Sequence, residues 1–424
     1  MKCYDYDMGS YKLHIIPTDK FKTVNISINF KRIIKKEEIT LRNFLNDILL
    51  SSNNDYKTIK EMEIKSEDLY NIRVYGNTSK SGRYGLISIN GSFLNEKYTE
   101  KDMNNQSLSF IMDLLFNPNV SNNAFDKKSF EIVYNSLNEE IEGFIEEPRA
   151  YSEIRCLEEV DNTIPFSFRG CGYIEDLKKI TPKNLYEYYK SVIQSDLIDI
   201  FIIGEVDVEK IKELISSKFI VNTKKKESET HYIDFDSYRK RANTIKESKD
   251  YNQSKLVLAA KVMNLSDFER QYALRLYTYI LGGAPDSKLF QTVREKNSLC
   301  YYINCSPKMV YSLITISCGI NKEDYKKCVK LIKKEMKNML DGNITDEELV
   351  KAKIAYISSF KELYDNPFAV IRNYLSHVQI GTDLMEESIE NIKKVTKEMI
   401  INVAHNIHLD TIYLLEGGNN NEEN

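Results

Sequence analysis

The stretch KKITPKNLYEYYKSVIQSDLIDIFIIG, residues 178–204, decides the fold of this chain of 424 residues. It begins with a Thr that can cap a helix, continues as a short amphipathic segment and ends as an apolar run at Gly204. The stretch KKVTKEMIINVAHNIHLDTIYLLEG, residues 393–417, has the same features in the same order. A pattern that recurs at such a distance predicts a duplicated helix–strand unit.

The beginnings of the two halves also resemble each other. VNISINF at residues 24–30 precedes an expected helix at 40–50, and KLVLAAKVM at 255–263 precedes one at 268–281. In both places an apolar run with strand character is followed by helical periodicity. We therefore expect an α+β fold of two similar α/β domains.

The domain boundaries follow from composition. We expect an N-terminal domain at residues 1–221 and a C-terminal domain at 251–416. The polar, charged segment 222–250 between them is typical of a linker, with one short strand at 231–235, and residues 417–424 form a solvated tail. The remaining pattern predicts strands at 72–75, 84–93, 300–305 and 311–319, and helices at 105–116, 123–143, 150–161, 182–194, 322–340 and 345–364.

Composition excludes several classes of function. The chain has 59 Lys and Arg against 63 Asp and Glu, so it lacks the basic excess expected of a nucleic-acid binder. No apolar run is long enough to cross a bilayer, and the first residues lack the apolar core of a secretory signal. Seven cysteines without a CxxC pair indicate reduced thiols. We expect a cytoplasmic protein that binds neither nucleic acid nor membrane.

The segment LGGAPDSKLFQTVREKNSLCYYI, residues 281–303, is the most specific indication of a functional site in the sequence. It predicts a turn at Gly282 and Gly283, a helix from about residue 287 and a strand from about residue 300. Folding back between these elements would bring Arg294 and Tyr301 together. Such a pair can hold a peptide carbonyl, because Arg offers a fork of donors and Tyr a single O–H. The alternative is that Arg294 pairs with a surface Glu while Tyr301 fills the core.

This motif resembles the C-terminal-domain signature of the insulinase/pitrilysin metallopeptidases, and the resemblance covers nearly the whole chain. It implies two similar domains that form a bowl-shaped half-chamber. It also implies a catalytic role for Arg294 and Tyr301 and a substrate-binding role for Gly282 and Gly283.

Active members of that family carry an HxxEH zinc motif on an early helix. Laying this motif on LRNFLNDILL puts Asn43, Asn46 and Asp47 at its three functional positions, and the resemblance matches a later Glu ligand to Glu139. Asn is a poor zinc ligand and cannot act as a base. Asp47 with a distant Glu remains as an alternative site for a hard cation. We expect no metal or other cofactor in this chain, with His14 at a core or surface position.

The intact Arg/Tyr pair and the altered zinc motif together imply a division of labour. We expect the chain to be the non-zinc-binding partner subunit of a heterodimeric zinc metallopeptidase, inactive alone. Zinc would then lie in a homologous HxxEH-containing subunit, and the substrates would be peptides. The alternatives are a homodimer, a catalytically inactive scaffold or assembly protein of the same fold, and a self-sufficient peptidase with an unrecognised metal site.

Overall fold

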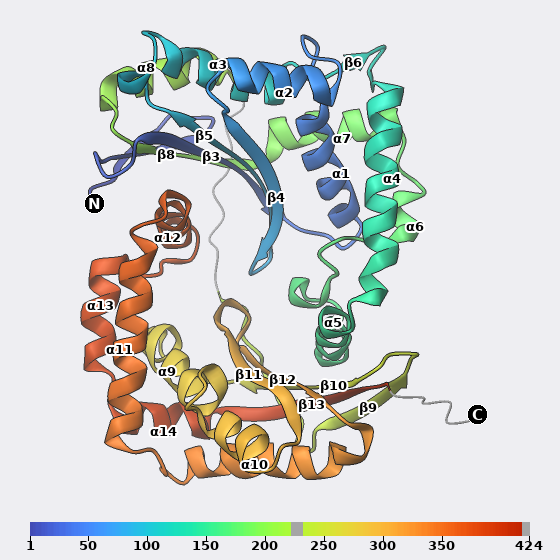
Figure 1. Cartoon of the computed structure of the whole chain (residues 1–424), viewed down its shortest axis with the longest axis vertical. Helices are drawn as coiled ribbons and strands as arrows, with labels where there is room; N and C mark the ends of the chain where they lie inside the picture. Colours follow the sequence, from blue (N-terminus) through green and yellow to red (C-terminus); the bar gives the residue numbers. More distant parts are fainter. Residues whose placement is uncertain (222–231, 418–424) are drawn as a thin grey trace. The chain divides into compact units, whose positions relative to one another are not determined.

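The computed structural model describes residues 1–221 and 232–417, which form two compact units. The first contains residues Met1–Gly143, Arg169–Glu229 and Asn366–Leu375, and the second contains Phe144–Phe168, Thr230–Asp365 and Ser376–Asn424. The helices and strands are labelled in Figure 1. No helix of the described part of the chain is long and apolar enough to cross a membrane.

The first unit is built on a six-stranded sheet with the strand order β1-β2-β8-β3-β5-β4. Its strands are β1 (Tyr4–Asp7), β2 (Lys12–Pro17), β3 (Thr23–Ile33), β4 (Arg73–Ser81), β5 (Tyr84–Leu94) and β8 (Leu197–Gly204). A small hairpin is made by β6 (Val120–Ser121) and β7 (Ala124–Phe125). The helices are α1 (Glu38–Ser51), α2 (Ile59–Asp68), α3 (Met103–Phe116), α4 (Lys127–Gly143), α6 (Ile174–Leu177), α7 (Pro182–Ser195) and α8 (Val208–Lys218).

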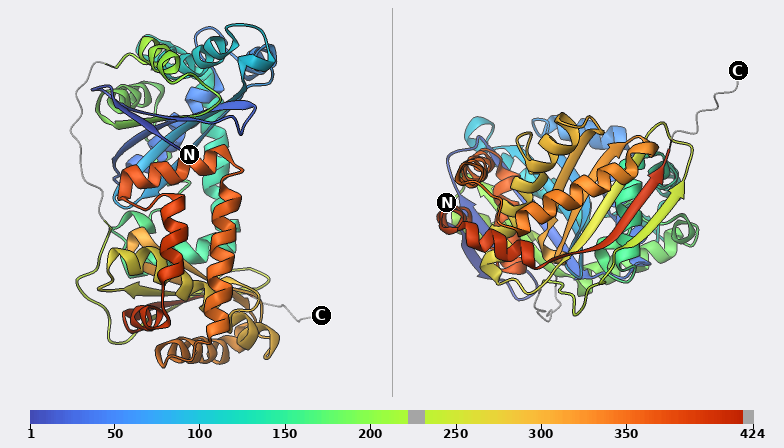
Figure 2. Two further views of the ribbon diagram at one scale, coloured as in Figure 1. Left: turned by 90° about the vertical axis from the view of Figure 1, so that its left-hand side faces the viewer. Right: turned by 90° about the horizontal axis from the view of Figure 1, so that it is seen from below.

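The second unit is built on a five-stranded sheet with the order β11-β12-β10-β13-β9. Its strands are β9 (Asn243–Ser248), β10 (Ser254–Val262), β11 (Cys300–Lys308), β12 (Leu313–Ile320) and β13 (Ile407–Glu416). In the view from below in Figure 2, the red β13 runs beside its neighbours β9 and β10. The helices are α5 (Pro148–Val160), α9 (Leu274–Thr278), α10 (Tyr325–Leu340), α11 (Asp346–Leu363), α13 (Met385–Lys394) and α14 (Lys397–His405), while α12 (Pro367–Ile380) belongs to the first unit up to Leu375 and to the second from Ser376. Three π-helical segments, Glu269–Ala273, Tyr279–Gly283 and Phe290–Glu295, lie around and after α9.

The two sheets share one topology. Strands β2, β8, β3, β5 and β4 of the first correspond in order to β9, β13, β10, β12 and β11 of the second. In each sheet one pair is parallel, β2 with β8 and β9 with β13, and the pairs that follow are antiparallel. The repeated helix–strand unit is α7–β8 and α14–β13, and its two capping threonines, Thr181 and Thr396, accept from the backbone N–H of Asn184 and Met399. The predicted duplication is therefore confirmed, and within residues 1–221 and 232–417 β1 has no counterpart in the second sheet.

Each half of the chain also gives a helix to the other unit. α5, from the first half, packs on β10 and β13 of the second sheet. Residues Val257 and Ala259 of β10 face α5, while Leu256 and Leu258 lie in the core on the opposite face, which explains why this strand is apolar on both sides. In return, the N-terminal part of α12 belongs to the first unit, where Phe368 contacts Tyr75 edge to face with ring centroids 5.5 Å apart.

The units thus interleave along the chain, whereas the sequence pattern predicts contiguous ranges. The amphipathic pattern of α5 indicates a buried face but not the sheet that covers it. Within the expected linker 222–250, residues Asn243–Ser248 form the edge strand β9. The described part of the expected strand at 231–235 is not a strand, and residues 222–231 and 418–424 lie outside the described residues.

Candidate functional site

Arg294 lies on the outer face of the π-helical segment Phe290–Glu295. Leu289 and Val293 are completely buried and fix the segment against the core of the second unit. Phe290 is partly buried against the same core, and the partly exposed Arg294 covers it, with Cζ 4.5 Å from the centroid of the Phe290 ring. π-helical segments are frequent at functional sites.

Tyr301 lies on β11, at the edge of the five-stranded sheet. The register of β11 with β12 is irregular between Cys300 and Ile303, and such irregularities re-aim side chains. Tyr301 is accordingly 79% exposed, and its ring centroid lies 5.6 Å from Cζ of Arg294. The structure thus brings the two predicted residues together.

The donors of this pair are free for a ligand. Within the described residues, neither the Arg294 guanidinium nor the Tyr301 hydroxyl makes a hydrogen bond, and the nearest carboxylate oxygen, of Glu295, lies 3.7 Å from Arg294 Nε. Aromatic rings hold the cation through its π faces and leave its N–H groups unused. Of the alternative interpretation, the pairing of Arg294 with a surface Glu is present, with Glu295, whereas Tyr301 is exposed and not in the core.

The neighbouring Tyr302, unlike Tyr301, is packed against other side chains. Its ring packs under Arg149, with 4.8 Å from the centroid to Cζ, and 5.6 Å from Nζ of Lys255. Burial raises the pKa of Tyr302 to about 12. Tyr302 therefore has a structural role, and only Tyr301 is presented to solvent beside Arg294.

Gly282 and Gly283 precede this helix and differ in their surroundings. Gly282 is buried, and a Cβ at this position would lie 2.8 Å from Cβ of Cys305 on β11. Gly283 is exposed, and its nearest contact would be 3.4 Å, to the carbonyl oxygen of Thr278. Gly282 thus lets the helical segment pack closely on the strand that carries Tyr301. The substrate-binding role of both glycines stays a prediction.

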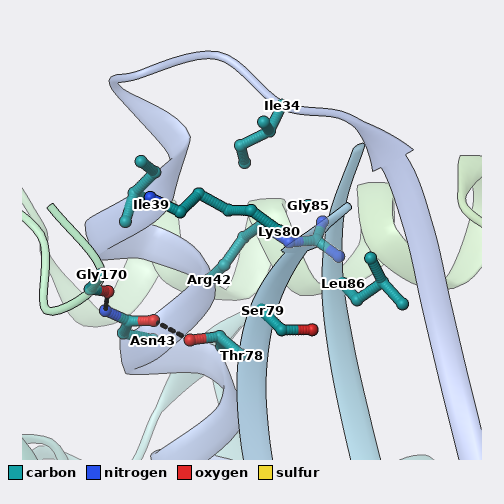
Figure 3. A pocket seen from close by; sticks show the side chains of 10 residues that line it. All are labelled: Ile34, Ile39, Arg42, Asn43, Thr78, Ser79, Lys80, Gly85, Leu86 and Gly170. Atoms are coloured by element: carbon teal, nitrogen blue, oxygen red, sulfur yellow. Dashed lines mark hydrogen bonds between the residues drawn. The ribbon is translucent and has the colours of Figure 1, made fainter. Parts of the chain in front are cut away.

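The second candidate region is helix α1, where the resemblance places the altered zinc motif. The Asn43 amide donates to the carbonyl oxygen of Gly170 over 2.7 Å and accepts from the Thr78 hydroxyl. Figure 3 shows both hydrogen bonds, which connect α1 to β4 and to the loop at Gly170. Both ends of this amide are therefore used within the protein.

Of the other two positions of the motif, Asn46 and Asp47, only Asp47 has a side chain that commonly binds metal ions. The Asn46 amide donates to Asp47 over 2.9 Å, and its buried oxygen has no partner in the part of the chain that the structure describes. Burial raises the pKa of Asp47. The pKa of Glu140 on α4 is also raised, first by desolvation and then by the charge of Asp47. It is thus Glu140, and not the predicted Glu139, whose carboxylate the charge of Asp47 reaches.

These residues do not fit a zinc ion. The charge of Asp47 raises the pKa of Glu140, but among the described residues neither carboxylate belongs to a group of three His, Cys, Asp or Glu ligands, and Asn43 is held by protein contacts. Beside Asn43 lies a pocket of about 60 Å³, large enough for small solvent molecules only. It is lined by Ile34, Ile39, Arg42, Asn43, Thr78, Ser79, Lys80, Gly85, Leu86 and Gly170 (Figure 3).

Comparison with known proteins agrees with this geometry. Residues 179–356 match the family described as "Peptidase M16 inactive domain". The chain is 26% identical over 415 residues, 96% of each chain, to the "Probable inactive metalloprotease YmfF" of Bacillus subtilis strain 168. The crystal structure of a conserved protein from Enterococcus faecalis V583 has a TM-score of 0.91 at 25% identity and covers 99% of this chain and 100% of that one. That of a peptidase M16 inactive domain from Pseudomonas fluorescens has a TM-score of 0.78 at 15% identity over 98% of both chains. The insulinase-like resemblance and the two-domain fold are thereby confirmed.

Proposed function

We propose that this chain, which is similar to M16, or insulinase-like, proteins, is the subunit without the catalytic HxxEH zinc site in a two-chain zinc peptidase. A homologous subunit with an intact HxxEH motif would hold the metal. This chain would supply Arg294 and Tyr301 to bind the substrate and to stabilise the oxyanion that forms during peptide hydrolysis. Its substrates would be peptides or extended segments, and it would cleave none of them alone.

The observation that carries this proposal is the free, aligned Arg294/Tyr301 pair. The Arg294 guanidinium lies against the rings of Phe290 and Tyr301, and its one ion pair among the described residues is a loose contact with the exposed Glu295, 3.7 Å from Nε. An exposed pair of this kind contributes little to folding, so a ligand is the simplest reason for it. A planar fork of donors suits a backbone carbonyl, and a phenol suits the negative charge that develops on the same oxygen.

The state of α1 supports the absence of a catalytic metal in this subunit. Asn43 is used to hold β4 and the Gly170 loop, and Asn46 cannot take a proton from water. Zinc in the partner would polarise the scissile carbonyl and activate a water molecule. The name of the Bacillus subtilis relative, an inactive metalloprotease, supports the same proposal.

The test combines this chain with a homologous chain that carries HxxEH and follows the cleavage of a fluorogenic peptide library. We expect cleavage by the pair and none by this chain alone. Tyr301→Phe should lower kcat on the order of 10²-fold, as loss of an oxyanion donor does, and Arg294→Ala should also raise KM. Tyr238→Phe and Arg241→Ala are the matched controls, because both residues are exposed in the same unit and lie outside the pair.

Assembly is measured in parallel by size-exclusion chromatography. Full activity of the zinc subunit alone would contradict the proposal. Unchanged activity in both Arg294→Ala and Tyr301→Phe complexes would favour the alternative, a scaffold or assembly protein of the same fold. Cleavage by this chain alone, as a homodimer or with its own metal, would favour a self-sufficient peptidase.

A further inference from the structure

A group of side chains with metal-binding chemistry lies at the N-terminal edge of the first sheet, away from α1. The ligand atoms of Cys3, Asp5 and His14 all lie within 4.8 Å of one another. Asp5 on β1 and His14 on β2 are direct cross-strand partners, and Cys3 immediately precedes β1. The hairpin register therefore brings thiol, carboxylate and imidazole to one place, although their sequence spacing forms no known motif.

The imidazole of His14 is held in a fixed orientation. Its side chain is 3% exposed, and its ring stacks on Phe201 with centroids 4.3 Å apart. Nδ1 lies 2.6 Å from Oδ1 of Asp5, and Nε2 lies 3.4 Å from Oδ1 of Asp199, a buried carboxylate on β8. A carboxylate behind a histidine is the usual support of a metal-bound imidazole, because it holds a proton on the far nitrogen and leaves the near one free to coordinate.

The partly buried thiol of Cys3 is the third member of the same group. Cys3 Sγ lies 3.4 Å from Oδ1 of Asp5, so both potential ligands are in contact before any metal arrives. Burial and the negative charge of Asp5 raise the pKa of this thiol. A divalent cation would reverse that preference, because a coordinating thiol is deprotonated by the metal.

We propose that Cys3, Asp5 and His14 bind one Zn²⁺ ion, with water as the fourth ligand. Sulfur, nitrogen and oxygen donors in one site suit zinc, whereas Mg²⁺ and Ca²⁺ take oxygen ligands. Tetrahedral bonds of about 2.0–2.1 Å separate nitrogen and oxygen ligands by roughly 3.3 Å. The Asp5 carboxylate, 66% exposed, has the freedom to move outward from its 2.6 Å contact with His14.

The site has a structural purpose. β1 is an edge strand that pairs only with β2, over four residues, and it has no counterpart in the second sheet. A metal that joins β1 to β2 fixes this additional strand. The inference concerns residues outside the Arg294/Tyr301 site and does not depend on the proposed function.

The test uses the full-length chain after treatment with a chelator and titrates it with Zn²⁺ in a calorimeter. We expect one equivalent to bind, and Cys3→Ser or His14→Gln to weaken binding at least 100-fold. Asp199→Asn should weaken it 10–100-fold, as loss of a carboxylate behind a ligating histidine does. Cys171→Ser is the matched control, because Cys171 is also a partly buried thiol of the first unit.

Two further measurements identify the ligands. Co²⁺ in place of Zn²⁺ should give a sulfur-to-metal charge-transfer band that is absent in Cys3→Ser, a substitution outside the hydrophobic core. Hydrogen exchange in residues 3–16 should slow when Zn²⁺ is added. The inference is wrong if the wild-type chain binds no zinc, or if Cys3→Ser and Cys171→Ser bind it equally well.

Discussion

The packing of Gly282 against β11 predicts a large difference between two adjacent glycine substitutions. In Gly282→Ala the new Cβ would lie 2.8 Å from Cβ and 3.0 Å from the backbone nitrogen of Cys305. Carbon atoms in contact are normally about 3.5–4.0 Å apart. Both Cys305 atoms belong to or adjoin the backbone of a paired strand, so no rotamer change relieves the overlap, and the helical segment must shift.

Overpacking of this kind costs about 1–3 kcal/mol of unfolding free energy. For a unit of this size each kcal/mol corresponds to about 2–4 °C in Tm, so Gly282→Ala should lower the Tm of the second unit by roughly 2–12 °C. In Gly283→Ala the nearest contact is 3.4 Å, and the reduced entropy of the unfolded chain should leave stability unchanged or raise it by about 0.4–1 kcal/mol.

Differential scanning calorimetry measures both variants, since it can separate the transitions of the two units. An unchanged Tm in Gly282→Ala, or an equal loss in both variants, would refute the packing argument. The pair also separates packing from substrate binding. If Gly283 contacts the substrate, Gly283→Ala should raise KM in the two-chain assay without lowering Tm.

Four other substitutions test the charged and polar groups of the first unit. Asp196→Asn should lower the free energy of unfolding by about 3–5 kcal/mol, because the buried Asp196 forms ion pairs with both Arg32 and Arg42. Glu205→Gln, which removes an exposed ion pair with Lys97, should lower it by less than about 1 kcal/mol. Urea unfolding measures both variants. Asn43→Ala should cost about 1–3 kcal/mol in the same measurement, since it leaves Gly170 and Thr78 without their partner, and an unchanged midpoint would contradict the structural role of this amide. The raised pKa of Asp47 means that the folded chain binds its proton more tightly than the unfolded chain, so its contribution to stability falls as pH rises through that pKa. Asp47→Asn should therefore be more stable than wild type at pH 7, with a difference that shrinks as the pH falls and disappears below about pH 3, where carboxyls of ordinary pKa (about 3.9 for Asp) are also protonated; a constant difference across this range would be evidence against burial as the cause.

The elements best predicted from the sequence are those with repeated or strongly periodic patterns. The two threonine-capped helix–strand units have the predicted bounds to within a few residues, and the hairpin β11–β12 follows the predicted strands. The meeting of Arg294 with Tyr301 was also predictable, because a short helix followed at once by a strand must fold back on itself. Their chemical roles stay predictions.

Other features depend on partners that the sequence does not specify. β9 has one apolar residue on its covered face, Ile245, so its composition indicates a linker, and only its parallel pairing with β13 makes it a strand. Which of Glu139 and Glu140 faces Asp47 depends on the rotation of α4 about its axis, and the sequence pattern does not fix this rotation to within one residue. The group of Cys3, Asp5 and His14 depends on a cross-strand register that spacing along the chain does not reveal.

The reciprocal exchange of α5 and α12 sets an order of events during synthesis. The apolar face of α5, with Leu157 and Val160, is made well before β10 and long before β13, the two strands that it covers. The first unit likewise lacks the contact of Tyr75 with Phe368 until the start of α12 has been synthesised. Neither unit can complete its hydrophobic core on the ribosome when its own half of the sequence has been synthesised. Both units therefore finish folding late in translation. A chain that terminates early in the second half would leave apolar surface exposed in both units, and such products would be natural targets for chaperones and for degradation.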